Sequence, residues 1–223
     1  MRAPRLLLLA FAAGSLAIAG CQGSPSVPQT SLTPLSSAPA HLTITNGAYQ
    51  VEVMAGPASQ SAAVLASSSR SPTSYSVVAM PEGTYSVRFA AGSGGAQSWT
   101  VRLSPKPSWE VVVQGGTTHL VLDLSGLKLR SLAIAGGAYT MVIDLPPAQG
   151  DVPVEVTGGA NRITFVVPGA SSATLLAGPG VSRVQGGIPE GSRRYVVGSS
   201  SGAAAGYQIR VTSGAALVVL STG

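Results

Sequence analysis

The strongest constraint on the fold is a repeated segment of about 21 residues with a Gly-Gly pair near its centre. Three consecutive copies run as VVVQGGTTHLVLDLS (111–125), LAIAGGAYTMVIDLP (132–146) and VEVTGGANRITFVVP (154–168). Their second glycines are Gly116, Gly137 and Gly159, which lie 21 and 22 residues apart. A fixed period of this length is typical of repeat architectures, in which each unit buries its apolar face against its neighbours.

Each copy has large apolar residues at five positions, namely five and three before the second glycine and four, six and eight after it. Because successive side chains of a strand point to opposite faces, this alternation predicts two strands per copy, each with one face in a core. We expect the Gly-Gly pair to form the turn between the strands, with the second glycine at positive φ. The fifteen apolar residues are Val111, Val113, Leu120, Leu122, Leu124, Leu132, Ile134, Met141, Ile143, Leu145, Val154, Val156, Ile163, Phe165 and Val167.

The same template extends beyond the three regular copies. It fits around Gly47 and Gly214, fits in part around Gly95 and Ser71, and fits poorly around Gly187. We therefore expect one repeat β domain over residues 41–223. Its regular copies occupy 109–168, and degenerate copies occupy 41–108 and 169–223.

The pattern predicts an all-β fold, and two architectures satisfy it. One is a β-solenoid, a β-helix-like stack of two-strand coils of about 21 residues; the other is an antiparallel hairpin meander or sandwich. Equal spacing of three consecutive copies favours the solenoid. The chain is 45% hydrophobic and only 9% charged, so its bulk is not intrinsically disordered.

The N-terminus has the layout of a signal peptide. Arg2 and Arg5 precede the apolar run LLLLAFAA (6–13) and a stretch of small residues (16–20) that ends at Cys21, the only cysteine. The run is too short for a spanning helix, which needs about 20 apolar residues. Residues 18–21 (IAGC) resemble the bacterial lipobox, at which the Cys thiol is acylated and the chain is cut just before it. We therefore expect residues 1–20 to be removed and acylated Cys21 to hold the protein in membrane lipid. The alternative is an ordinary secretory signal with a chance cysteine.

Residues 22–40 (QGSPSVPQTSLTPLSSAPA) contain four prolines and five serines with no hydrophobic period. This composition predicts a tether. Residues 21–40 would then be a lipidated cysteine with a Pro/Ser-rich linker, which holds the β domain on the extracytoplasmic face of a membrane.

The run LDLSGLKLRSLAIAGGAYTMVIDLP (122–146) and the following VPVEVTGGANRITFVVP (152–168) resemble the bacterial toastrack-type adhesin-like domains. The resemblance implies a β-solenoid-like scaffold of the kind found in envelope proteins and in membrane proteins linked to envelope stress sensing. It supplies no catalytic residues. We accordingly expect a lipid-anchored structural or interaction module at the cell envelope, with envelope polysaccharide or protein as its partner. The alternatives are an accessory or sensor protein in the envelope stress response and, less favoured, an envelope enzyme.

Asp123 and Asp144 are the first candidates for chemistry, because both lie seven residues after a second glycine. In a stacked solenoid they would face outward on adjacent coils about 4.8 Å apart. Two carboxylates this close repel, raise one pKa or share a cation. The alternative is a solvated pair screened by Lys128 or Arg130, since Val166 takes the same slot in the third copy.

The remaining candidates are few. His41 and His119 lie in different copies, neither has an acid partner that the sequence identifies, and no Cys or His cluster has metal-ligand spacing. We therefore expect no metal, no cofactor and no catalytic residue, and no Gly-x-Ser-x-Gly elbow is present. Trp99 occupies an inward slot. Trp109, at the start of the first regular copy, is either a surface anchor for a ligand or a cap on the core.

The charge pattern argues against nucleic acid as a partner. The net charge of +5 includes Arg2 and Arg5 of the predicted signal peptide. Arg193 and Arg194 form the sole adjacent basic pair, and no basic stripe interleaves with aromatic residues.

Overall fold

The computed structural model describes residues 39–45, 47–68, 75–89, 97–198 and 205–223. Within these ranges the chain forms eighteen strands and one 3₁₀ turn at Pro81–Gly83, so the all-β prediction is confirmed. The strands are β1 Ala40–Thr45, β2 Ala48–Ala55, β3 Val64–Ser68, β4 Tyr75–Met80, β5 Thr84–Phe89, β6 Ser98–Leu103, β7 Ser108–Val113, β8 Thr117–Asp123, β9 Lys128–Ile134, β10 Ala138–Asp144, β11 Asp151–Val156, β12 Ala160–Val167, β13 Ser172–Ala177, β14 Val184–Gln185, β15 Ile188–Pro189, β16 Arg194–Val197, β17 Gly206–Val211 and β18 Ala215–Thr222.

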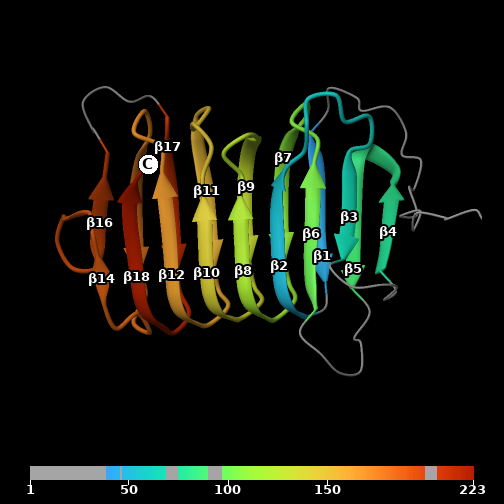
Figure 1. The fold of residues 1–223 in the computed structure, drawn as a ribbon. Coiled ribbons are helices and arrows are strands. Elements are labelled where there is room, and N and C mark those ends of the chain that lie inside the picture. The colour runs from blue at the N-terminus through green and yellow to red at the C-terminus, as the bar shows by residue number, and fades with distance from the viewer. Residues whose placement is uncertain (1–38, 46, 69–74, 90–96, 199–204) are drawn as a thin grey trace, which may run out of the picture.

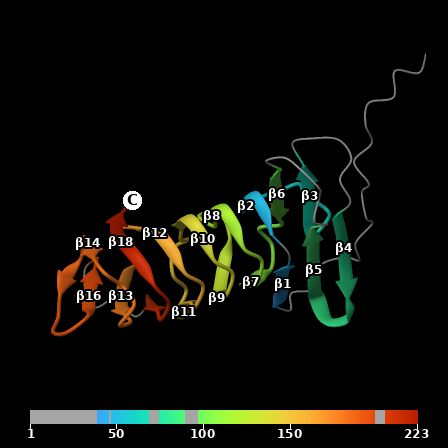
Figure 2. The ribbon, with the colours of Figure 1, turned by 90° about the horizontal axis from the view of Figure 1, so that it is seen from below.

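Two sheets face each other along the molecule (Figures 1 and 2). Sheet A has the order β15-β16-β13-β17-β11-β9-β7-β1-β5-β4, and sheet B has the order β14-β18-β12-β10-β8-β2-β6-β3. Each regular copy runs along sheet A, turns at its Gly-Gly pair and returns along sheet B. The three regular coils are thus β7 with β8, β9 with β10, and β11 with β12.

Equivalent strands of successive coils pair in parallel and in register. In sheet B, for example, Leu120, Met141 and Ile163 lie opposite one another on β8, β10 and β12. A hairpin meander would instead pair the two strands of one copy antiparallel. The solenoid prediction is therefore confirmed, and the meander is wrong for the regular copies.

The core fills the space between the sheets. All fifteen template residues of the regular copies are at most 2% exposed, and they belong to one continuous hydrophobic cluster. Burying a Val, Leu, Ile or Phe side chain stabilises a fold by about 1.5–3 kcal/mol. Since the chain has one cysteine, it has no internal disulfide, and packing and backbone hydrogen bonds hold the stack together.

The order of the coils differs from the order of the chain at both ends. The coil β1–β2 lies between β5–β6 and β7–β8, and the coil β17–β18 lies between β11–β12 and β13–β14 (Figure 1). Val51 of β2, for example, pairs with Trp99 of β6 on one side and Leu120 of β8 on the other. The first and last coils of the domain are therefore interior coils of the stack.

The expected backbone conformation of the second glycines is wrong. Gly116, Gly137 and Gly159 are not among the residues with positive φ. The first glycine of each pair faces inward instead, since Gly115, Gly136 and Gly158 are buried while the second glycines are exposed. The Gly-Gly pair therefore does not serve a left-handed turn.

Two of the first glycines, Gly136 and Gly158, are required by the close approach of successive turns. A Cβ atom on Gly136 would overlap the carbonyl oxygen of Gly115, and one on Gly158 would overlap that of Gly136. The turns are also joined by hydrogen bonds from one coil to the next: Ala138 N donates to Gly159 O (3.0 Å), and Thr117 N donates to Gly137 O (2.9 Å). Glycine thus lets the turn backbones stack as closely as the strands do.

Antiparallel strands close both ends of the stack. At one end β4 pairs antiparallel with β5, and β3 with β6; at the other, β16 pairs antiparallel with β13 and β15. The expected copies around Ser71 and Gly187 are therefore wrong as coils. In a regular copy the strand after the turn belongs to sheet B and buries its slot residues. Ser71 itself lies outside the described residues, but the strand that follows it, β4, belongs to sheet A, and its slot residue Ala79 is exposed. Gly186 and Gly187 have positive φ, between two strands of two residues each.

The predicted signal peptide, Cys21 and most of the predicted tether lie outside the described residues. β1 begins at Ala40, one residue before the expected start of the domain. Across the described part of the chain, no helix is both long enough and apolar enough to cross a membrane.

Candidate functional site

Asp123 and Asp144 lie opposite each other at the ends of β8 and β10, as their shared slot predicts. Asp123 Oδ1 accepts hydrogen bonds from Ser125 Oγ (2.7 Å) and Ser125 N (3.3 Å). Partial burial raises the pKa of Asp144, and the nearby charge of Asp123 raises it further. The next strands place Met54 beside Asp123 and Val166 beside Asp144, so neither neighbour in the ladder supplies another ligand oxygen. In the described ranges, no group of three or more His, Cys, Asp or Glu side chains could hold a metal ion.

The two histidines lie on different sheets. His41, on β1 of sheet A, has its Nδ1 2.9 Å from Glu110 Oε2. The expectation that neither histidine has an acid partner is therefore wrong for His41, because the parallel pairing of β1 with β7 sets residue 41 opposite residue 110. His119, on β8 of sheet B, has its Nδ1 2.7 Å from Thr140 Oγ1.

Arg130 does not lie beside the aspartate pair, so the alternative in which it screens their charge is wrong. It belongs to β9 of sheet A, where its Nε lies 3.8 Å from Glu110 Oε1, whereas Asp123 and Asp144 lie on sheet B. The Glu110 carboxylate thus contacts Arg130 of one neighbouring strand, β9, and His41 of the other, β1. All three side chains are partly exposed, so these contacts contribute little to stability.

Trp109 lies in the core. It is 0% exposed, its Nε1 donates a hydrogen bond to Ser104 O (2.8 Å), and its ring lies 5.9 Å from that of Tyr85. A surface position for Trp109 is therefore wrong. Trp109 lies two residues before the buried Val111 on β7, so both side chains point to the same, inward face of the strand.

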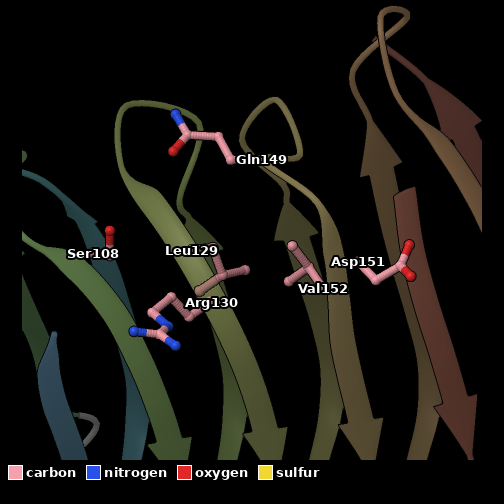
Figure 3. A pocket seen from close by; sticks show the side chains of 6 residues that line it. All are labelled: Ser108, Leu129, Arg130, Gln149, Asp151 and Val152. Carbon is pink, nitrogen blue, oxygen red and sulfur yellow. The ribbon is translucent and has the colours of Figure 1, made fainter. Parts of the chain in front are cut away.

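A polar depression of about 400 Å³ opens where β7, β9 and β11 begin (Figure 3). It is lined by Ser108, Leu129, Arg130, Gln149, Asp151 and Val152. Arg130 and Asp151 line it from different strands, and their charged groups point away from each other (Figure 3). None of the six lining residues is a histidine or a cysteine, and the polar side chains among them offer hydrogen bonds and charge.

The depression arises from a local separation of two strands. β9 and β11 pair only over Leu132–Ile134 and Val154–Val156. Arg130 is the extra residue of a bulge against β7, and Pro153 has no N–H to donate to a neighbouring strand. The starts of β9 and β11 therefore lie apart, with the loop that carries Gln149 above them (Figure 3).

The outer face of sheet B carries a feature that the sequence reasoning missed. Tyr49 on β2 and Tyr139 on β10 are 44% and 60% exposed. The flanking pairs in the register place Tyr49, Thr118 of β8 and Tyr139 on one line across three neighbouring strands. We call these three residues the tyrosine row. With one strand between them, the two tyrosines are about 10 Å apart along the stack.

A signal for the tyrosine row is present in the sequence. Tyr49 and Tyr139 each lie two residues after a second glycine, Gly47 and Gly137. Strict alternation would direct both side chains inward, since Tyr139 lies two residues before the buried Met141. Alternation breaks just after the turn, however, because Ala138 and Met141 are buried while Tyr139 between them is exposed.

Residues 35–166, more than half of the chain, match the family described as the N-terminal domain of toast_rack, DUF2154. The chain belongs to this toast_rack family. A search of curated proteins finds no match.

The toast_rack fold also has a solved counterpart. The crystal structure of a candidate cell adhesion protein from Clostridium sporogenes ATCC 15579 superposes with a TM-score of 0.70 at 16% sequence identity. The match covers 84% of this chain and 94% of that chain. At this identity the likeness concerns the fold alone.

The toast_rack match includes the less regular N-terminal part of the domain. It runs through the coil β1–β2 and ends in β12, so both tyrosines of the tyrosine row lie inside it. The interior coil β17–β18 and the strands that close that end of the stack lie beyond it.

Proposed function

We propose that this toast_rack protein is a non-catalytic module of the cell envelope, anchored in a membrane by acylated Cys21. In this role the β-stack is a rigid body that makes adhesin-like contacts through the outer faces of its two sheets. The observation that carries the proposal is how the repeat divides its residues. The regular apolar residues are buried in the core, so the outer faces of the two sheets are the surfaces that can contact a partner.

The anchoring part of the proposal rests on the sequence. Residues 18–21 match the lipobox at all four positions, and the chain has no second cysteine that could explain Cys21 as half of an internal disulfide. An acylated terminal cysteine can carry more than one lipid chain, which is what stable anchoring requires.

The contact part of the proposal rests on the surface chemistry and on the fold. The polar depression has no histidine or cysteine among its lining residues, and the described residues hold no group of ligands for a metal. The fold is that of a candidate cell adhesion protein, which supports a contact role here.

Attachment of cells that produce the protein tests the proposal. We expect cells with the wild-type protein to attach to each other or to a surface better than cells without it. The Cys21→Ser variant should lose this gain and leave the membrane fraction. A matched variant of the polar depression, Arg130→Gln with Asp151→Asn, should retain both properties. Equal attachment with and without the protein would contradict the proposed function.

A further inference from the structure

The tyrosine row is held rigidly by the stack. β2, β8 and β10 pair in register, and Thr117 ties the three coils together: its N donates to Gly137 O (2.9 Å) and its Oγ1 to Tyr49 O (3.0 Å). The spacing between the backbones of Tyr49 and Tyr139 is therefore fixed before any ligand arrives. A surface arranged in advance avoids part of the entropic cost of binding.

Polar side chains border the tyrosine row on the same face. The neighbouring outward positions are Gln50, His119, Thr140 and Arg162, on β2, β8, β10 and β12. The His119 ring meets the Tyr49 ring edge to face, with centroids 5.3 Å apart and an interplanar angle of 75°. Thr140 Oγ1 lies 2.7 Å from His119 Nδ1. His119 is thus held from both sides and helps to fix the Tyr49 ring.

The charge beside the tyrosine row is positive. Arg162 is exposed and lies opposite Thr140. The acidic side chains of sheet B lie away from the tyrosine row. Glu52 accepts a hydrogen bond from Thr100 (3.2 Å) on β6, which flanks β2 on the side opposite the row. Asp123 and Asp144 lie at the other ends of their strands. The row therefore complements an anionic partner.

We infer that the tyrosine row binds a linear acidic polysaccharide whose β-linked sugar rings lie flat along the stack. An exposed tyrosine ring packs against the C–H face of a sugar ring while its hydroxyl and its polar neighbours bond to sugar hydroxyls. The spacing of about 10 Å between the tyrosines is comparable with the advance of two rings in an extended β-1,4-linked chain. Alternate rings of such a chain present the same face, so two of them can reach Tyr49 and Tyr139 together. Arg162 then pairs with a sugar carboxylate. This inference rests on the proposed function and names its partner.

Titration calorimetry of the purified full-length protein in detergent tests the inference. The probes are β-1,4-linked mannuronate oligosaccharides of two, four and six units, and neutral cello-oligosaccharides of the same lengths. We expect the four-unit and six-unit acidic probes to bind much more tightly than the two-unit probe, because only they span both tyrosines. Tyr49→Ala and Tyr139→Ala should each weaken binding of the six-unit probe about tenfold and remove the dependence on length. Arg162→Gln should remove the preference for the acidic series.

Two matched variants separate this role from a general effect on the fold. Tyr139→Phe keeps the ring and should retain most of the affinity. Leu176→Ala changes a side chain of similar exposure, 40%, on sheet A and should have no effect. Equal binding by the wild type and the double tyrosine variant, or no binding of either series, overturns the inference. If neither series binds but cell attachment still requires Cys21, the sugar partner is wrong while the proposed function stands.

Discussion

Gly136 lies so close to Gly115 of the preceding coil that a Cβ atom on Gly136 would overlap the Gly115 carbonyl oxygen. Neither glycine has positive φ, so the constraint comes from space rather than from backbone conformation. The contact joins the turn of β9–β10 to that of β7–β8.

The Gly136→Ala variant should therefore be strongly destabilised. Relieving the overlap requires the turns to move apart, and overpacking of this kind costs about 1–3 kcal/mol of unfolding free energy. Gly116→Ala is the control, because its Cβ would lie 3.7 Å from the nearest atom, Gly137 O, and we expect a change of less than about 1 kcal/mol. Urea denaturation of the two variants checks the prediction. Equal losses in both would show that the turn backbones are not in close contact.

Trp109 should stabilise the domain through both its volume and its hydrogen bond. Trp109→Phe keeps much of the ring but leaves Ser104 O without the Nε1 donor, which we expect to cost about 1–3 kcal/mol. Trp109→Ala should cost more, about 3–5 kcal/mol. The exposed Tyr139→Phe serves as the control and should leave the melting temperature unchanged. An unchanged melting temperature in Trp109→Phe would mean that the hydrogen bond is not formed.

Asp144 should make stability depend on pH. Because the pKa of Asp144 is raised above its ordinary value of 3.8, the folded state binds the proton more tightly than the unfolded state. The group then favours folding below its unfolded pKa, and this contribution is lost as the pH rises through the folded pKa. Asp144→Asn should thus raise the melting temperature at neutral pH relative to wild type, and the gain should vanish at about pH 3. A gain of the same size at both pH values would refute the role of ionisation.

Calcium should not stabilise the fold through the aspartate pair. A cation at Asp123 and Asp144 would need further oxygen ligands, and the adjacent ladder positions are Met54 and Val166. We expect the melting temperature of the full-length protein to be unchanged by millimolar Ca²⁺. A rise that disappears in Asp144→Asn would establish a cation site and contradict this account.

The regular coils could be predicted because their chemistry repeats. Leu120, Met141 and Ile163 occupy the same position in successive copies, and in a parallel stack such residues lie directly opposite one another on neighbouring strands. The same reasoning predicted that Asp123 lies beside Asp144. The position of β1–β2 inside the stack could not be predicted, because its apolar pattern fits beside any coil and carries no information on which neighbours it takes.

The errors have equally specific causes. A Gly-Gly pair suits both a left-handed turn and a close backbone approach, and for Gly136 only the stacking of the coils distinguishes the two. His41 and Glu110 are brought together by strands that are distant in the chain. The tyrosine row was missed because alternation breaks just after the turn: Tyr139 lies two residues before the buried Met141, where strict alternation would direct it inward, yet it is exposed.

The central claim is that a lipid on Cys21 anchors the β-stack at the membrane, and the mass of the mature protein tests it most directly. We predict that intact-protein mass spectrometry of the membrane-extracted chain will show residues 1–20 removed and a mass increase on Cys21 that corresponds to a diacylglyceryl group, with or without an amide-linked acyl chain. A mature chain with an unmodified Cys21, or one that begins at another residue, would contradict the account.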